Sequence, residues 1–520
     1  MTFGSGACWQ ATYLSPTNVG ASSLARYVLS LDQGTTSSRA VLFDDRSRLL
    51  RTAKQEFRQI FPRPGWVEHD PAAIWSTQIR TAKQAAADCS SKVAAIGVTN
   101  QRETTIVWDR HSGRPIHNAI VWQDRRTASI VDNLVSRGYS PYVRRSTGLI
   151  PDAYFSGPKI KWILENVPKA KKRARNGDLL FGTVDSYLVW RLTGGRVHAT
   201  DPSNASRTMI FDIKRRSWDS RLLGLLEIPA DMLPEVKSSS EIFGYTDARL
   251  FGREIPVGGV VGDQQAALFG QAGFQKGAAK NTYGTGCFML LNAGDRPPTP
   301  RFGLISTIAW SLEDRVSYAL EGSVFIGGAV VQWLRDRLGV LEKASDTEWI
   351  GRETPDSGGV FFVPALTGIG APYWDMYARG LIIGITRDTT RNQIIRAALE
   401  AICHQTVDVL EAMTKTTGGR PRSLKVDGGA SVNNFLMQLQ ADLLGLSIER
   451  SAIAETTALG AAFLAGLAVG VWDDLSELKN LRRVDRVFRP AMAANVRTEM
   501  RKGWKRAVQR ALDWARPDDA

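Results

Sequence analysis

The residues 32–39, DQGTTSSR, join two apolar runs that are both expected to form strands. This connection is longer than the two-residue turn of an ordinary hairpin, and it combines one glycine with four hydroxyl side chains. Gly34 would let the backbone approach a ligand closely. The groups that would donate hydrogen bonds or positive charge to that ligand are Thr35, Thr36, Ser37 and Arg39. These residue types predict a loop that binds an anion.

Two aspartates stand at the ends of apolar strands. Asp32 closes the first strand, and a carboxylate beside bare phosphate makes sense if it holds Mg²⁺ directly or through water. Asp263 follows the apolar residues 257–261 and starts a helical pattern, so it should lie at the carboxyl end of a strand, where ligands bind in α/β sheets. The alternatives are a capping aspartate in a turn for Asp32 and an ordinary N-cap for Asp263.

A second segment repeats the first. Residues 281–292, NTYGTGCFMLLN, again indicate a strand, a Gly-Thr turn and a strand. Two such hairpins facing each other would close a phosphate site between two lobes, with the cleft as the active site. The chain has no Gly-Lys dipeptide, hence no Walker A loop, and no GxGxxG or HExxH motif. A nucleotide would therefore be bound by the paired hairpins.

The length and the order of elements predict a two-lobed α/β protein. The chain has 520 residues, too many for one ordinary core, and its 43% hydrophobic content is typical of a globular protein. Strands and helices alternate along it. The expected strands are residues 27–31, 40–43, 93–98, 106–108, 179–181, 257–261, 281–283, 288–291 and 424–426. The expected helices are residues 72–87, 184–192, 264–269, 329–337, 393–413 and 434–444.

The net charge of +14 raises the alternative of a nucleic-acid protein, but the basic residues are spread along the chain. The densest basic run, residues 501–506, falls on an amphipathic helix whose apolar face is expected to be buried. We therefore expect a solvated basic face and no nucleic-acid partner. That apolar face consists of Trp504, Ala507, Val508, Ala511 and Leu512.

Membrane and compartment signals are weak. The longest apolar stretch, residues 458–472, is too short to span a bilayer and predicts a buried helix. Residues 1–26 contain no acidic residue and one arginine. Three interpretations of this segment stay open: a disordered tail, a start site placed too far upstream, or an organellar targeting signal. Cys8, Cys89, Cys287 and Cys403 form no CxxC spacing and are typical of a reducing compartment, so we expect a cytoplasmic protein.

The residues together resemble the glycerol kinases of the FGGY carbohydrate kinase family, from about Tyr27 to the C-terminus. The phosphate hairpin is similar to the family's first phosphate loop, and NQRETT at 100–105 with GDQQ at 262–265 is typical of the glycerol branch. The other similar segments are GWVEHDP (65–71), YFSGPKIKWILEN (154–166), FVPALTGIGAPYWD (362–375) and VDGGASVNNFLMQ (426–438). The resemblance implies the actin-like, ribonuclease-H-like fold with duplicated domains and a central cleft. Its lobes would be residues 27–272 and 273–520.

The resemblance also implies the chemistry: ATP-dependent, Mg²⁺-assisted phosphorylation of glycerol to glycerol 3-phosphate in a homo-oligomer, dimer or tetramer. Asp263 would accept the proton, and Asp32 with Asp263 would hold the metal. The hydroxyls of a triol each need a donor and an acceptor, and the carbon chain needs an apolar cover. The implied glycerol residues are Arg102, Glu103, Tyr154, Asp263 and Gln264, with Trp122 and Phe288 as cover. The implied nucleotide residues are Thr35, Thr36, Ser37, Arg39, Thr285, Gly328, Gln332, Gly429, Ala430 and Asn434.

Two alternatives stay open at this point, and two regulatory devices look absent. A kinase for another polyol or a pentulose would share the fold, whereas an actin-like ATPase machine would turn over ATP without a polyol. Residues 245–254 lack the glycine pattern of the fructose 1,6-bisphosphate loop found in some members of the family. No histidine occurs between His198 and His404, where other members carry an activating phosphohistidine.

Overall fold

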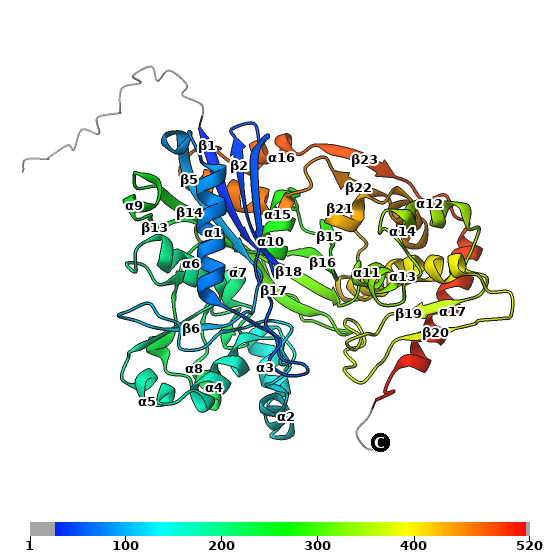
Figure 1. Cartoon of the computed structure of the whole chain (residues 1–520), viewed down its shortest axis with the longest axis horizontal. Coiled ribbons are helices and arrows are strands. Elements are labelled where there is room, and N and C mark those ends of the chain that lie inside the picture. Colours follow the sequence, from blue (N-terminus) through cyan, green and yellow to red (C-terminus); the bar gives the residue numbers. More distant parts are fainter. Residues whose placement is uncertain (1–25, 516–520) are drawn as a thin grey trace, which may run out of the picture.

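The computed structural model describes residues 26–515, which form two β-sheets with helices packed on their faces (Figure 1). The first sheet has the order β13-β14-β5-β1-β2-β3. Its strands are β1 (Tyr27–Gln33), β2 (Ser37–Asp44), β3 (Leu49–Glu56), β5 (Val93–Asn100), β13 (Ser240–Tyr245) and β14 (Pro256–Gly262). The second sheet has the order β17-β18-β16-β15-β21-β22-β23. Its strands are β15 (Ala279–Tyr283), β16 (Cys287–Gly294), β17 (Ile305–Leu312), β18 (Arg315–Val324), β21 (Leu424–Asp427), β22 (Ile448–Ser451) and β23 (Val484–Phe488).

The two sheets repeat one topology. In each sheet the first two strands along the sequence form a hairpin, because β1 pairs antiparallel with β2 and β15 pairs antiparallel with β16. A strand parallel to the first member of the hairpin follows on its other side, β5 beside β1 and β21 beside β15. On the same side of both sheets there follow a further parallel strand and an antiparallel edge strand, β14 and β13 in the first sheet and β22 and β23 in the second. The other side of the hairpin is extended by β3 in the first sheet and by β18 and β17 in the second. The internal repeat that the two Gly-Thr turns predict is confirmed.

The expected helices form at the predicted places. The long helix α13 extends the predicted residues 393–413 by a turn, and its apolar stripe is buried. The larger helices are α1 (Pro71–Ala85), α2 (Ala128–Ser136), α3 (Ser140–Thr147), α4 (Ser156–Asn166), α6 (Val184–Leu192), α10 (Asp263–Gly270), α11 (Ala329–Asp336), α12 (Asp346–Glu353), α13 (Arg391–Thr417), α14 (Asn434–Leu444), α15 (Thr456–Ala468) and α17 (Ala494–Ala511). The shorter ones are α5 (Ala170–Arg175), α7 (Pro202–Ala205), α8 (Ser220–Leu226), α9 (Ala248–Phe251) and α16 (Leu475–Leu481).

Short two-stranded pairs lie outside the two large sheets. The predicted strands at 106–108 and 179–181 pair with each other in one of them. The short strands are β4 (Glu68–His69), β6 (Ile106–Asp109), β7 (Ala119–Ile120), β8 (Leu179–Gly182), β9 (Ala199–Thr200), β10 (Phe211–Asp212), β11 (Ser217–Trp218), β12 (Glu235–Val236), β19 (Phe361–Val363) and β20 (Leu381–Ile383).

Two helices lie between the sheets and join the two halves of the chain. Helix α10 packs against β15 and β16 of the second sheet, whereas α15 packs against β1, β5 and β14 of the first (Figure 1). The helices approach each other closely through glycines: a Cβ at Gly460 would lie 1.9 Å from the carbonyl oxygen of Ala266. Most of the apolar stretch 458–472 therefore belongs to the buried helix α15, as predicted, and residues 469–472 follow that helix. The small residues of α15 permit its close contact with α10.

The remaining sequence expectations can be compared with the structure. On α17, Trp504, Ala507, Val508 and Ala511 are buried and Leu512 is partly buried, which confirms the amphipathic face. Cys89, Cys287 and Cys403 are free and buried, whereas Cys8 and the predicted tail up to residue 25 lie outside the described residues. Between residues 26 and 515 no helix is both long and apolar enough to cross a membrane.

Candidate active site

The first phosphate hairpin is a tight, braced turn. The backbone N–H of Gly34 donates to the carbonyl of Ser37 over 3.0 Å, and the Ser38 hydroxyl donates to Gln33 over 2.8 Å. Between these bonds the turn presents Thr35 and Thr36, the latter exposed. The backbone is therefore fixed while its hydroxyls and N–H groups are available to an anion.

Arg39 of this hairpin links Asp32 to the second half of the chain. Arg39 forms ion pairs with Asp32, at 3.8 Å, and with Glu455, which precedes α15. Burial raises the pKa of Asp32 to about 6, with Arg39 opposing and the Asp263 carboxylate adding to the increase. The Arg39 charge is thus shared with protein carboxylates, and Asp32 and Asp263 influence each other across the site.

Asp263 and Arg102 meet because their strands are neighbours. Strand β5 ends at Asn100 and β14 ends at Gly262, and these two residues are paired in the parallel ladder. The chains that continue from them bring Arg102 Nε to 3.1 Å from Asp263 Oδ1, which also accepts the Gln264 backbone N–H over 2.7 Å. The carboxyl ends of two parallel strands therefore place the predicted base beside the predicted arginine.

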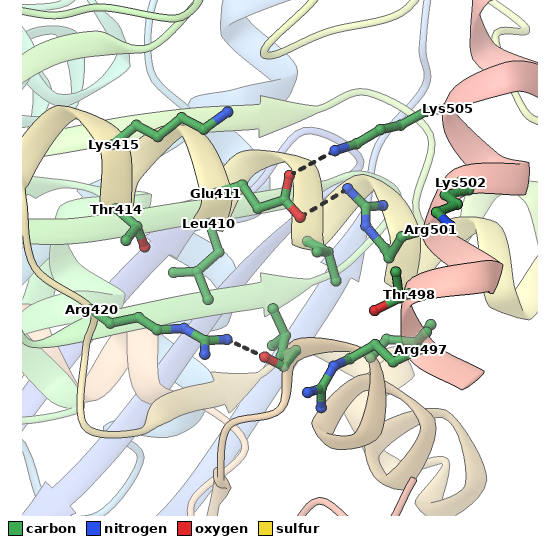
Figure 2. Close-up of a pocket in the computed structure, with 13 residues that line it drawn as sticks. Leu410, Glu411, Thr414, Lys415, Arg420, Arg497, Thr498, Arg501, Lys502 and Lys505 are labelled. Atoms are coloured by element: carbon green, nitrogen blue, oxygen red, sulfur yellow. Dashed lines mark hydrogen bonds and ion pairs between the residues drawn. The ribbon is translucent and has the colours of Figure 1, made fainter. Parts of the chain in front are cut away.

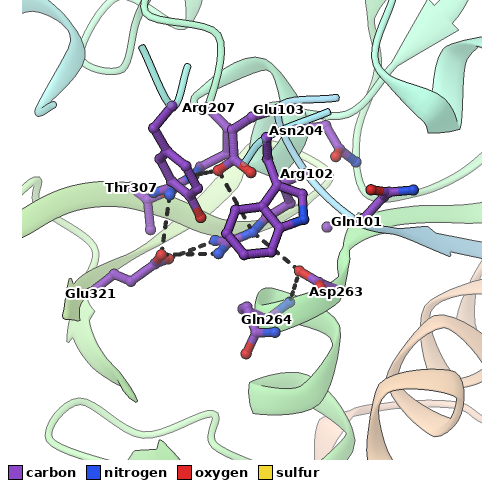
Figure 3. A network of polar contacts seen from close by, with 12 residues as sticks. Gln101, Arg102, Glu103, Asn204, Arg207, Asp263, Gln264, Thr307 and Glu321 are labelled. Atoms are coloured by element: carbon purple, nitrogen blue, oxygen red, sulfur yellow. Dashed lines mark hydrogen bonds and ion pairs between the residues drawn. The ribbon is translucent and has the colours of Figure 1, made fainter. Parts of the chain in front are cut away.

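The Arg102 guanidinium is held mainly by Glu321, a residue of β18 in the second sheet (Figure 3). Arg102 Nη1 and Nη2 donate to the two Glu321 oxygens over 2.6 and 2.9 Å, and Nη1 also reaches Gln265 Oε1 at 3.2 Å. This is a bidentate pair between two buried side chains, and it joins the two halves of the protein. The paired arginines lower the pKa of Glu321 to about 2, against its burial.

A second arginine completes the network. Arg207 donates through Nε to Glu103 Oε1 over 2.6 Å and through Nη2 to Glu321 Oε1 over 3.1 Å. Burial raises the pKa of Glu103, while Arg207 and Arg102 oppose that increase. Among the described residues Arg207 Nη1 is buried without a hydrogen-bond partner. The network thus leaves one buried donor for a polar ligand.

Glu103 has a backbone conformation that few residues other than glycine adopt, with φ at +62°. Its carbonyl oxygen accepts hydrogen bonds from the hydroxyls of Ser156, over 3.0 Å, and Thr105, over 3.1 Å. Such strained residues persist where the surroundings fix them, and they cluster at functional sites. The side chain of this residue pairs with Arg207 through Oε1.

Three aromatic side chains surround one side of the network. Trp122 packs edge-on against Tyr154 and Phe288, with ring centroids 5.7 and 6.2 Å apart. The indole N–H donates to the Thr35 hydroxyl over 3.0 Å, and Phe288 belongs to β16 of the second hairpin. Burial, followed by the nearby Glu103, raises the pKa of Tyr154. The aromatic group therefore links both hairpins and offers an apolar wall with one buried hydroxyl.

Gln264 is oriented by a lysine that lies on the opposite sheet. Lys280 Nζ, on β15, donates to Gln264 Oε1 over 2.5 Å and to the Thr282 hydroxyl over 2.9 Å. Burial lowers the pKa of Lys280 to about 8, while Asp427 and Asp263 oppose that decrease. The lysine fixes the amide and adds positive charge near Asp263.

A cavity of about 480 Å³ lies in the second half of the chain, within the usual range for small-ligand sites. The apolar side chains Val331, Leu399, Ile402 and Leu436 form part of its wall. The predicted residues Thr285, Gly328, Gln332, Gly429 and Ala430 also line it. The second Gly-Thr turn thus opens into an apolar cavity that suits a flat base.

Asn434 is not among the residues that line this cavity, whereas its neighbour Asn433 is. The Asn434 amide instead donates to Glu348 over 3.0 Å. Asn433 caps α14 by accepting the Leu436 N–H over 2.9 Å, and its amide donates to Thr347 over 3.0 Å. The cap geometry of α14 decides which of the two asparagines faces the cavity.

Four residues of the polar network went unrecognised in the sequence: Arg207, Gln265, Lys280 and Glu321. Lys280 is the one charged residue of β15, and Glu321 is the one charged residue between positions 316 and 324 of β18; isolated charges in such strands are a signal of a buried ion pair. Their partners lie far away in the chain, Glu321 being 219 residues from Arg102. Gln265 adjoins the predicted pair at 263 and 264.

Comparison with known proteins agrees with the geometry. Residues 27–270 match the N-terminal domain, and residues 279–469 the C-terminal domain, of the FGGY family of carbohydrate kinases. Glycerol kinase 2 of Thermotoga maritima is 59% identical over 492 residues, 94% of this chain and 99% of that protein. The glycerol kinase of Symbiobacterium thermophilum is also 59% identical over 492 residues, with the same coverage.

Solved structures show the same architecture. The crystal structure of Plasmodium falciparum glycerol kinase with ADP has a TM-score of 0.88 at 36% identity and covers 94% of this chain and 98% of that chain. A ligand-bound xylulose kinase from Lactobacillus acidophilus shares the fold alone, with a TM-score of 0.82 at 24% identity, 94% of this chain and 97% of that chain. The chain therefore belongs to the FGGY family of carbohydrate kinases, and within that family it groups with the glycerol kinases.

Proposed function

We propose that the cleft between the two sheets aligns the γ-phosphate of ATP with a terminal hydroxyl of glycerol, and that Asp263 receives the proton of that hydroxyl. The protein is thus an ATP-dependent kinase that phosphorylates glycerol, as its group implies. The observation that carries the proposal is the meeting of Asp263, Arg102 and Glu103 at the ends of β5 and β14, between the phosphate hairpin and the aromatic wall.

Phosphoryl transfer through a loose transition state needs alignment and charge stabilisation more than covalent help. The first hairpin supplies hydroxyls and backbone N–H groups to the phosphates, and the second hairpin with its cavity receives the adenosine. Asn433 is the asparagine that we assign to the cavity in place of Asn434. Closure of the two halves would exclude water and so protect ATP from hydrolysis.

The glycerol subsite follows from the polar network. Glu103 is bonded to Arg207 through Oε1, which leaves Oε2 to accept a substrate hydroxyl, while Arg207 Nη1 is a free donor. The Tyr154 hydroxyl and the Gln264 amide provide further partners, and Trp122 with Phe288 covers the carbon chain. Because Arg102 is engaged by Glu321 and Asp263, we assign it first to orienting the base.

The donor set at the base of the cleft fits Mg²⁺. Mg²⁺ is usually held by one or two carboxylates together with phosphates and water. Asp32 and Asp263 are two such carboxylates, and the charge of Asp263 helps to raise the pKa of Asp32. Residues 26–515 contain no group of three or more His, Cys, Asp or Glu side chains that could hold a metal ion. When bound, Mg²⁺ would neutralise phosphate charge and favour in-line transfer.

The test is ADP release from the purified protein with Mg-ATP and glycerol, D-xylulose, L-ribulose, sorbitol or no acceptor. We expect glycerol alone to stimulate strongly and Asp263→Asn to reduce the rate by several orders of magnitude. Asp314→Asn, an exposed carboxylate between β17 and β18, is the matched control and should behave like the parent. Stimulation by a pentulose would assign the cleft to another sugar, and turnover that ignores every acceptor would favour an ATPase machine.

Assembly as a homo-oligomer, dimer or tetramer, stays a prediction of the family resemblance. Size-exclusion chromatography with light scattering measures it directly, since a monomer and a tetramer differ fourfold in mass.

A further inference from the structure

A second cavity lies away from the cleft, between the C-terminal half of α13, the end of α14 and helix α17 (Figure 2). Its volume is about 490 Å³, similar to that of the nucleotide cavity. The two cavities share no lining residue. This cavity therefore has the size of a small-molecule site without belonging to the catalytic cleft.

The lining carries a strong excess of positive charge. Six of its residues are basic, namely Lys415, Arg420, Arg497, Arg501, Lys502 and Lys505. The one carboxylate in the lining is Glu411. Figure 2 shows these side chains around the cavity, coming from α13, the loop after it and α17. Cations gathered in a hollow repel one another, and their field attracts anions.

Protein carboxylates neutralise only part of this charge. The buried carboxylate of Asp408 pairs with Arg501, Glu411 pairs with Arg501 and Lys505, both at 3.4 Å, and Lys502 pairs with Glu499 at 2.8 Å. Lys415, Arg420 and Arg497 form no ion pair within the described part of the chain.

A structural role explains part of the arrangement. Arg420 donates to the Leu444 carbonyl, and Arg497 donates to the Asp442 carbonyl over 3.3 Å, so both serve the C-terminal end of α14. These contacts engage one nitrogen of each guanidinium, and a guanidinium has five N–H donors. Arg501 Nε is also buried without a hydrogen-bond partner. Capping therefore leaves both charge and donors unused in the cavity.

We propose that this cavity binds a small, multiply charged anion that carries two or more phosphate groups. Several cations from three elements suit a ligand with more than one dianionic group, and guanidinium groups match phosphate oxygens in bidentate geometry. A cavity of about 490 Å³ has room for a compact ligand, whereas an extended strand of nucleic acid needs a longer basic surface. Helix α13 connects the two sites, since Leu399 and Ile402 line the nucleotide cavity and Leu410 lines this one.

The experiment is calorimetric titration of the full chain with inorganic tripolyphosphate, and with orthophosphate, at constant ionic strength. We expect one saturable site for tripolyphosphate besides any binding in the ATP cleft, and much weaker binding of orthophosphate. Lys415→Gln combined with Arg420→Gln should weaken this site at least tenfold. Glu411→Gln, which removes the one carboxylate of the lining, should strengthen it severalfold.

Two matched controls separate this site from the cleft and from the general positive field. Arg39→Gln, in the phosphate hairpin, should weaken only tripolyphosphate binding in the cleft. Lys214→Gln combined with Arg387→Gln, at exposed positions elsewhere, should leave the site unchanged. The proposal is overturned if the site survives the Lys415 and Arg420 change in a folded variant, or if the exposed control weakens it equally. Tighter binding of a short RNA with the same variant dependence would also overturn it.

Discussion

Replacing Glu321 by glutamine tests whether the second half of the chain positions the catalytic groups of the first. The side chain is fully buried and forms two hydrogen bonds with Arg102 and one with Arg207. Glutamine keeps the shape but removes the charge, so two buried guanidinium groups face each other with less compensation. Breaking one partner of a buried ion pair costs roughly 3–5 kcal/mol.

The direction of the kinetic effect follows from the geometry. Without the Glu321 carboxylate, Arg102 is drawn toward Asp263, which already lies 3.1 Å from Nε, and Arg207 is drawn toward Glu103. Both shifts occupy the groups that would receive the hydroxyl proton and the substrate hydroxyls. If about 3 kcal/mol falls on the transition state, kcat/KM for glycerol falls about a hundredfold, because each 1.4 kcal/mol is a factor of ten.

The assay is steady-state ADP release with glycerol and ATP varied separately, together with thermal melting of each variant. We expect a higher KM for glycerol and a lower kcat, with the KM for ATP within twofold of the parent. Glu241→Gln removes a partly exposed ion pair with Lys237 at 2.8 Å; it is the matched control and should change neither kcat nor the KM for glycerol. A folded Glu321→Gln variant with kcat and glycerol KM within twofold of the parent would refute the reasoning.

Two further changes test the packing and the pH dependence. Gly460→Ala places a Cβ against the Ala266 carbonyl and should lower the free energy of unfolding by about 2 kcal/mol. Gly224→Ala, in helix α8, has open space around the new Cβ and should be neutral or slightly stabilising. Urea unfolding of both variants measures the difference. Burial lowers the pKa of His69 to about 4, so its contribution to stability is complete above the ordinary value of 6.5 and is lost as the pH falls toward 4. By pH 5 this loss of stability is about 2 kcal/mol. The His69→Gln variant should therefore show a smaller decrease in the free energy of unfolding between pH 7 and pH 5. An unchanged decrease would contradict the attribution of this pH dependence to His69.

Local sequence patterns predicted most of the fold because strands and helices here follow apolar periodicity closely. The meeting of Arg102 with Asp263 was also predictable, since each follows the carboxyl end of a parallel strand. Glu321 was not, because it contacts the site from the middle of a strand in another sheet, and only the packing of the two halves brings it there. The choice between Asn433 and Asn434 depends on one cap residue, which is finer than periodicity can resolve. The division into lobes at residues 272 and 273 stays a prediction.

The polar network also suggests why the two halves of the chain must act together. Glu321, Lys280 and Glu455 all come from the second half of the chain. They contact Arg102, Gln264 and Arg39 of the first half, which we assign to orienting the base, to the substrate and to the phosphates, respectively. A relative movement of the sheets would change the charge around Asp263 and the phosphate hairpin at the same time. Opening of the cleft would release Arg102 from Glu321 and leave the base misaligned, so the catalytic arrangement is complete only when the halves are together. Such coupling would restrict phosphoryl transfer to the closed state, in which water is excluded.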